Sequence, residues 1–235
     1  MSGAFGVFLI LLFGIPRFII VLRANVTGDY NLVPVIFIFM AIMPILFLTR
    51  EGRKMIGIRK PEKSQWLLYS FLIGIAACSL SFLLAELFFN DTLSNWFVYI
   101  SKSYAVSKTG FQESDRLIYF MIYALVSMTF SPIGEEFFYR GIVHSTFAVH
   151  SGNQKASIFD SLAFAVTHLA HFGVVYISGE WKFLFVPALT WMLFMFATGR
   201  LFFFCKEKTG SIWGAVLSHV GYNLAMMYFI FYHVL

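Results

Sequence analysis

Long apolar runs separated by short polar loops dominate the chain. They extend over Met1–Leu22, Leu32–Leu48, Trp66–Phe89, Leu117–Val149, Ala156–Ser178, Phe183–Phe204 and Ser211–Leu235. A helix needs about 20 apolar residues to cross the hydrocarbon core of a bilayer, and most of these runs are that long or longer. The runs are continuous and do not alternate between apolar and polar residues as membrane strands do. The pattern therefore predicts an all-α membrane protein, a polytopic bundle of about seven (six to eight) transmembrane helices.

Composition supports a membrane protein and argues against a soluble domain and a nucleic-acid-binding protein. Hydrophobic residues make up 59% of the 235 residues and charged residues only 12%, about half the charged share of a soluble domain. The net charge of +5 is spread over short loops, so we expect the lipid bilayer and no nucleic acid as a partner. Cys78 and Cys205 lack metal-ligand spacing and are interpreted as small core residues. The first run has no cleavage site and should remain as an anchor.

The loops differ in charge, and this difference predicts an orientation. The loop Thr49–Gln65 carries six basic and two acidic residues, whereas the loops 23–31 and 90–116 are neutral. Basic loops stay in the cytoplasm, so this loop and the N-terminus are predicted to be cytoplasmic, in a bacterial inner membrane. Residues 90–116 hold a cluster of aromatics that suggests a piece lying in the interface, namely Trp96, Phe97, Tyr99 and Tyr104.

The run Ser131–Gly141 places two adjacent carboxylates and a guanidinium within apolar sequence. Pro132 and Gly134 precede the acidic pair and predict a kinked helix there. Glu136 and Arg140 are four residues apart, so they share a helix face and are expected to pair. Glu135 points about 100° away and is expected to lack that partner, which would leave it free as a base. Alternatively, both glutamates lie at a helix end among lipid headgroups.

Further polar side chains occur within other apolar runs. His168 shares a helix face with Phe164, and His219 shares one with Asn223. Polar groups inside a membrane face the bundle interior, so these residues and the glutamates are expected to converge. A carboxylate beside an imidazole would activate water, while a histidine and an amide would stabilise an oxyanion.

A metal site is the alternative for the same polar residues. Glu135 or Glu136 with His168 and His219 would bind a divalent cation, with zinc the most plausible, and leave one position for water. The candidate metal ligands are therefore Glu135, His168 and His219. His171, one turn after His168, is interpreted as a possible support for it.

Motifs of other intramembrane proteases are missing from the sequence. It contains neither H-E-x-x-H nor G-x-S-x-G. Paired intramembrane aspartates are not expected either, because each aspartate is predicted to lie in or beside a loop, namely Asp29, Asp91, Asp115 and Asp160.

The polar motifs together resemble the CPBP intramembrane proteases, also called the CAAX protease and bacteriocin-processing or Abi family. The resemblance rests on E-E-x-x-x-R (Glu135, Glu136, Arg140), F-x-x-x-H (Phe164, His168) and H-x-x-x-N (His219, Asn223), with F-x-x-G at Phe196–Gly199 and the approach Thr209–Trp213. It implies a membrane cavity open toward the cytoplasm. It also implies that Glu135 and His168 activate water, that His219 and Asn223 stabilise the oxyanion, and that Glu136 and Arg140 support the site. Metal dependence stays open, since members have been described as metalloproteases and as glutamate proteases.

The expected function is that of an intramembrane endopeptidase acting on a membrane-associated peptide or lipidated protein, CAAX-type or bacteriocin-like. One integral membrane domain is expected, in which residues 1–116 form N-terminal helices and loops and residues 117–235 form the catalytic core. The alternative is a non-proteolytic membrane protein, either an immunity or scaffold factor or a proton- or metal-coupled transporter.

Overall fold

The structure is a computed structural model that describes residues 2–104 and 113–235. Within them, five helical stretches are long and apolar enough to cross a membrane, one of which is continuous over Arg116–Ala170, and a shorter apolar helix spans Val33–Phe47. The prediction of an all-α polytopic membrane protein is confirmed. The principal helices are α1 (Gly3–Thr27), α2 (Val33–Phe47), α4 (Gln65–Phe89), α6 (Arg116–Glu135), α7 (His144–Thr167), α8 (Phe185–Thr209) and α9 (Ile212–Phe229).

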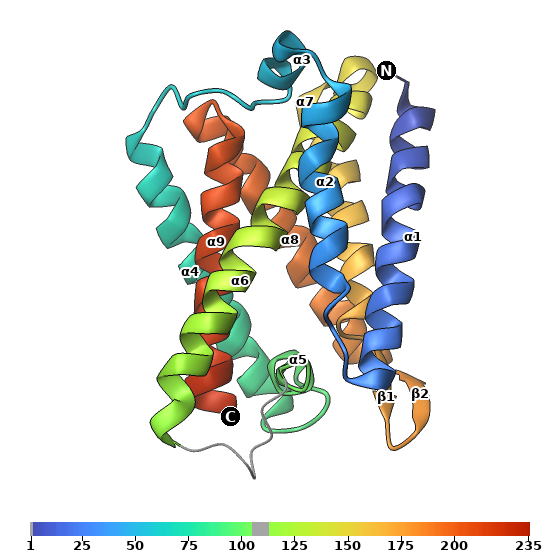
Figure 1. Ribbon diagram of the computed structural model, residues 1–235, viewed down its shortest axis with the longest axis vertical. Coiled ribbons are helices and arrows are strands. Elements are labelled where there is room, and N and C mark those ends of the chain that lie inside the picture. The colour runs from blue at the N-terminus through green and yellow to red at the C-terminus, as the bar shows by residue number, and fades with distance from the viewer. Residues whose placement is uncertain (1, 105–112) are drawn as a thin grey trace.

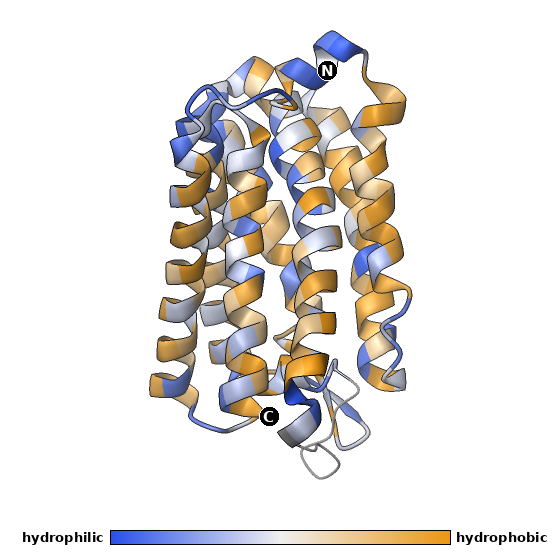
Figure 2. Ribbon diagram, turned by 60° about the vertical axis from the view of Figure 1, so that its left-hand side comes forward, coloured by the Kyte–Doolittle hydropathy of each residue, from blue (hydrophilic) through white to orange (hydrophobic). Residues whose placement is uncertain are grey.

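The bundle has two ends (Figure 1). At the loop end, the basic segment 49–65 with α3 (Arg50–Met55) meets the start of α9, where the Ile212 N–H donates to the Gly57 carbonyl at 2.8 Å. At the hairpin end lie α5 (Trp96–Ser101), a β-hairpin and the π-helix η4 (Ile230–Val234). Polar residues gather at the loop end (Figure 2).

The helix that carries the acidic pair is irregular. Directly after α6, the residues Glu136–Val143 form a π-helix, η2, which leads into α7. The sequence predicts a helix kink at Pro132 and Gly134. The structure instead has this π-helical turn directly after them, a feature that often marks functional sites. A second break occurs at Gly152 (φ 76°, ψ 162°), which divides α7. If the stretch Arg116–Ala170 is counted as two helices because of this break, the described residues contain seven apolar helices.

The prediction for residues 168–183 is wrong. The expected span Ala156–Ser178 ends as an α-helix at Thr167 and continues as one 3₁₀ turn, η3 (His168–Ala170). An antiparallel hairpin follows, with β1 (Val174–Ile177) paired to β2 (Glu180–Phe183). Its two-residue turn has positive φ at Ser178 and Gly179 (54° and 86°), which suits tight hairpins. Hydropathy alone does not distinguish so short an apolar run from the end of a helix.

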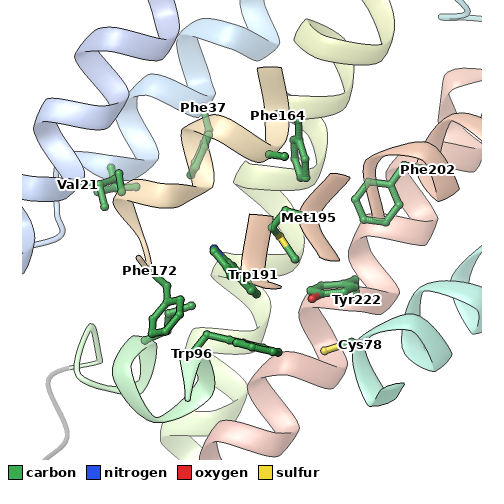
Figure 3. Packing of buried hydrophobic residues seen from close by; sticks show 14 of the residues in the cluster. Val21, Phe37, Cys78, Trp96, Phe164, Phe172, Trp191, Met195, Phe202 and Tyr222 are labelled. Atoms are coloured by element: carbon green, nitrogen blue, oxygen red, sulfur yellow. The ribbon is translucent and has the colours of Figure 1, made fainter. Parts of the chain in front are cut away.

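The described residues 90–104 after α4 include aromatic side chains that point inward. Trp96 and Phe97 are fully buried, and the Trp96 ring lies 5.7 Å from that of Trp191 (Figure 3). The expected interfacial piece is therefore a short helix, α5, that closes the hairpin end, followed after the undescribed residues by η1 (Glu113–Asp115). Lys108 lies outside the described residues.

Helices α4 and α9 pack closely through two glycines. A Cβ on Gly74 would meet the Ser218 carbonyl oxygen, and one on Gly221 would meet the Phe71 carbonyl oxygen. Small residues let membrane helices approach to backbone contact, where dispersion forces hold them together. This contact fixes the helix that carries His219 and Asn223.

Candidate active site

One cavity brings together the four residues predicted to act in catalysis. It has a volume of about 190 Å³, and its lining includes Glu135, His168, His219 and Asn223. They come from α6, from the turn after α7, and from α9. The expected convergence across the bundle interior is therefore present. Glu136 and Arg140 do not line this cavity and lie behind it.

Glu135 has a partner that the sequence reasoning did not assign. Its carboxylate is 1% exposed, and Oε1 lies 2.8 Å from Arg17 Nη2 on α1. The Ser131 hydroxyl donates to the same oxygen at 3.1 Å. Glu135 does not pair with Arg140, as expected, but it is not left free of a cation, because Arg17 comes from a distant helix. Its other oxygen, Oε2, is buried and has no hydrogen-bond partner among the described residues.

Arg17 lines the cavity and contacts two of the candidate catalytic residues, a placement that the sequence did not predict. It is 1% exposed in the middle of α1, where its Nη1 donates to Thr167 Oγ1 at 3.3 Å. Its Nη2 also lies 3.4 Å from His168 Nε2, and its guanidinium carbon lies 5.1 Å from the centre of the Phe37 ring. The signal in the sequence was an arginine within an apolar run, since an intramembrane charge requires a partner.

His168 is oriented by its own helix. Its Nδ1 lies 2.7 Å from the Phe164 carbonyl oxygen, which only accepts, so we assign the proton to Nδ1 and leave Nε2 as the acceptor. Nε2 lies 3.9 Å from Glu135 Oε2. A water about 2.8 Å from both atoms would bridge them at an angle of about 90°, which is ordinary hydrogen-bond geometry. The F-x-x-x-H spacing stacks the Phe164 ring 4.2 Å from the imidazole.

His219 and Asn223 lie across the cavity from that pair. His219 Nδ1 lies 2.9 Å from Glu136 Oε1, and its Nε2 lies 3.5 Å from the Ser131 hydroxyl. Asn223 Nδ2 donates to the Ser127 carbonyl at 2.8 Å. An amide nitrogen carries two N–H groups, so the second one remains for a ligand. Ser131 therefore connects the side of Glu135 with the side of His219.

A second charged group lies behind the cavity. We call Glu136, Arg140, His144 and Asp160 the buried cluster, and each is at most 4% exposed. The expected Glu136–Arg140 pair is present with a distance of 3.3 Å between Oε2 and Nε. Asp160 Oδ1 lies 3.7 Å from Arg140 Nε, and its Oδ2 lies 2.7 Å from His144 Nδ1. Asp160 was expected in or beside a loop, but the turn occurs earlier, at Gly152, so this residue is inside α7.

The comparison with protein families agrees with these motifs. Residues 117–225 match the family model described as Type II CAAX prenyl endopeptidase Rce1-like. This stretch is an Rce1-like domain of the CPBP, or CAAX protease, family. The match supports an intramembrane peptidase that acts on membrane-associated substrates. Searches of curated proteins and of solved structures gave no match. The Rce1-like region begins at α6, so Arg17 on α1 lies outside it.

The F-x-x-G motif of the Rce1-like domain has a steric explanation. A Cβ on Gly199 would lie 2.5 Å from Arg140 Nη2 and 3.0 Å from Ser161 Cβ. Only a residue without a side chain leaves room for the guanidinium at this point. The guanidinium carbon then lies 4.4 Å from the centre of the Phe164 ring, a cation–π distance.

The residues of the Rce1-like site do not fit a metal centre well. Among the described residues, no three His, Cys, Asp or Glu side chains approach closely enough to hold one ion. Glu135, the central candidate ligand, instead has the Arg17 cation 2.8 Å from Oε1, which opposes a divalent cation at that carboxylate. No reaction step is therefore derived through a metal.

Proposed function

We propose that the protein is an intramembrane endopeptidase that hydrolyses a peptide bond of a membrane-associated substrate, either CAAX-type or bacteriocin-like. The observation that carries the proposal is the Glu135 Oε2 atom. It is buried without a hydrogen-bond partner among the described residues and faces His168 Nε2 across 3.9 Å inside a cavity. Buried polar atoms are nearly always satisfied. Glu136 Oε2 also lacks a hydrogen-bond partner, but of the two glutamates only Glu135 lines the cavity, where a water could satisfy it.

The first step is activation of water. A water held between Glu135 Oε2 and His168 Nε2 gives its proton to the carboxylate as its oxygen attacks the carbonyl carbon of the substrate. The C=O π electrons move to the oxygen and form a tetrahedral oxyanion. When this collapses, the C–N bond breaks and the proton passes from Glu135 to the leaving amine. Glu135 returns to its initial state, and one water has been consumed.

The oxyanion would be stabilised from the opposite wall of the cavity. Asn223 has an N–H group to spare, and His219 presents Nε2. The carboxylate of Glu136 accepts the Nδ1 proton of His219, so only the doubly protonated ring also offers an Nε2–H donor. Each such donor in a site closed to water contributes about 3–4 kcal/mol to the transition state.

The orientation in the membrane belongs to the same proposal. The described residues of the loop end carry ten basic and three acidic side chains, which are Arg50, Arg53, Lys54, Arg59, Lys60, Lys63, Lys155, Arg200, Lys206 and Lys208 against Glu51, Glu62 and Glu207. Those of the hairpin end carry four basic and five acidic side chains, which are Arg23, Lys102, Arg116 and Lys182 against Asp29, Glu86, Asp91, Asp115 and Glu180. This asymmetry supports a cytoplasmic loop end and N-terminus, in the inner membrane of a bacterium.

The experiment compares new peptide termini in membranes that contain equal amounts of wild type or Glu135→Gln. Termini present only with wild type would support proteolysis and would identify both the substrate and the bond. Identical termini with both proteins folded would overturn the proposal and favour the non-proteolytic alternative, an immunity or scaffold factor or a transporter. If the protein is a scaffold or immunity factor, the Glu135→Gln variant should still protect cells.

A further inference from the structure

Arg17 makes three contacts that all converge on the proposed water site. Its Nη2 lies 2.8 Å from Glu135 Oε1 and 3.4 Å from His168 Nε2, while Nη1 donates to Thr167, the residue before His168. It lines the same cavity. These contacts join α1 to α6 and to the end of α7, the two elements that supply the reacting groups.

We propose that Arg17 is a positioning residue for the reaction. By holding Oε1, it directs Oε2 toward His168 and keeps the two groups at the separation that one water spans. A planar guanidinium can engage several acceptors at fixed angles, which an ammonium cannot do. This proposal rests on the proposed function, because the geometry matters only if Glu135 and His168 share a reacting water.

A purely structural role is the competing explanation. In that case Arg17 only neutralises a buried carboxylate, and its loss would lower the amount of folded protein without changing the turnover of what remains. A separation of kcat from KM distinguishes the two roles, because substrate contacts affect KM whereas misplacement of the base affects kcat.

The test uses a quenched peptide that spans the bond found in the terminus comparison, with rates normalised to folded protein. We expect Arg17→Met to lower kcat about 100-fold with KM changed less than about threefold, since small displacements of reacting groups have effects of this size. Arg17→Lys should recover part of this loss and remain about tenfold below wild type. Lys155→Met, which removes an exposed cation at the loop end, is the matched control.

Wild-type kcat in folded Arg17→Met would overturn the positioning role while leaving the proposed function intact. If Arg17→Met does not fold, Arg17→Lys decides alone, and an unchanged kcat in that variant would overturn the proposal. A wild-type protein without any turnover would instead remove the proposed function itself, so the two failures are distinguishable.

Discussion

Glu135 and Glu136 are adjacent and both pair with arginine, yet their surroundings differ. Glu135 pairs with Arg17 of another helix and lines the cavity. Glu136 pairs with Arg140 of its own helix and with His219, and it does not belong to the cavity lining. Pairing with arginine therefore does not distinguish the proposed base from the supporting carboxylate, whereas a place in the cavity lining does.

The same division extends to the neighbouring residues. We call Arg17, Ser131, Glu135 and His168 the cavity cluster, in contrast to the buried cluster behind it. Changes in the cavity cluster should act mainly on turnover. Changes in the buried cluster should act mainly on stability, because removal of one partner leaves an uncompensated charge in a dry interior.

The largest expected effect tests the cavity cluster. Glu135→Gln should lower turnover by about 10³- to 10⁴-fold, or roughly 4–5.5 kcal/mol, because the amide cannot take a proton from water. The amide oxygen still accepts from Arg17, so the apparent melting temperature should fall less than that of Arg140→Ala. Turnover is measured on the quenched peptide. The control is Glu86→Gln at the hairpin end, whose partner is Asn95, and retained turnover in Glu135→Gln would contradict the assignment of the base.

The next effect tests the buried cluster. Arg140→Ala should destabilise the fold by about 3–5 kcal/mol, since Glu136 and Asp160 would remain as buried carboxylates without their cation. Thermal unfolding in detergent measures this. Arg200→Ala is the control, because Arg200 is a cation near the surface whose hydrogen bonds go to Gln154 and whose guanidinium lies 5.7 Å from the centre of the Phe203 ring. Equal stability of Arg140→Ala and wild type would refute the idea that this cluster supports the fold.

A smaller effect is expected from crowding the same guanidinium. Gly199→Ala should cost about 1–3 kcal/mol of stability, because the new methyl group overlaps Arg140 Nη2 and Ser161. Gly3→Ala is the matched control, since its methyl group would meet Phe147 at an ordinary 3.6 Å. If both variants unfold at the same temperature, the steric explanation of the F-x-x-G motif is wrong.

The sequence predicted the residues of the candidate site better than the boundaries of the helices. Helical spacing placed Glu136 against Arg140 and His219 beside Asn223, because these relations are local and follow from 3.6 residues per turn. Hydropathy found the spans but not the hairpin after His168, since a short apolar strand and a helix end have the same composition. It also placed Asp160 in or beside a loop, whereas the break in the helix is at Gly152, eight residues earlier.

Partners from distant helices could not be predicted. Arg17 is a charge within an apolar run, but nothing in the order of residues indicates that it meets Glu135, which is 118 positions later in the chain. The closure of the hairpin end by α5 was hidden for the same reason, because it comes from long-range packing of Trp96 with Phe172 and Trp191.

The smallest effect tests the link between the two walls of the cavity. Ser131 donates to Glu135 Oε1 and lies 3.5 Å from His219 Nε2. Ser131→Ala removes one of the two groups that hold Oε1 while Arg17 remains, so we expect a loss of about 1 kcal/mol, or roughly fivefold in kcat, with little change in stability. Ser79→Ala on α4, whose hydroxyl donates to the Ile75 carbonyl, is the control. Because Arg17 alone then fixes the carboxylate, combining Ser131→Ala with Arg17→Lys should lower kcat by more than the product of the two single effects. If the loss of kcat in the double variant equals the product of the two single losses, the serine and the arginine act independently. Ser131 would then no longer belong to the cavity cluster.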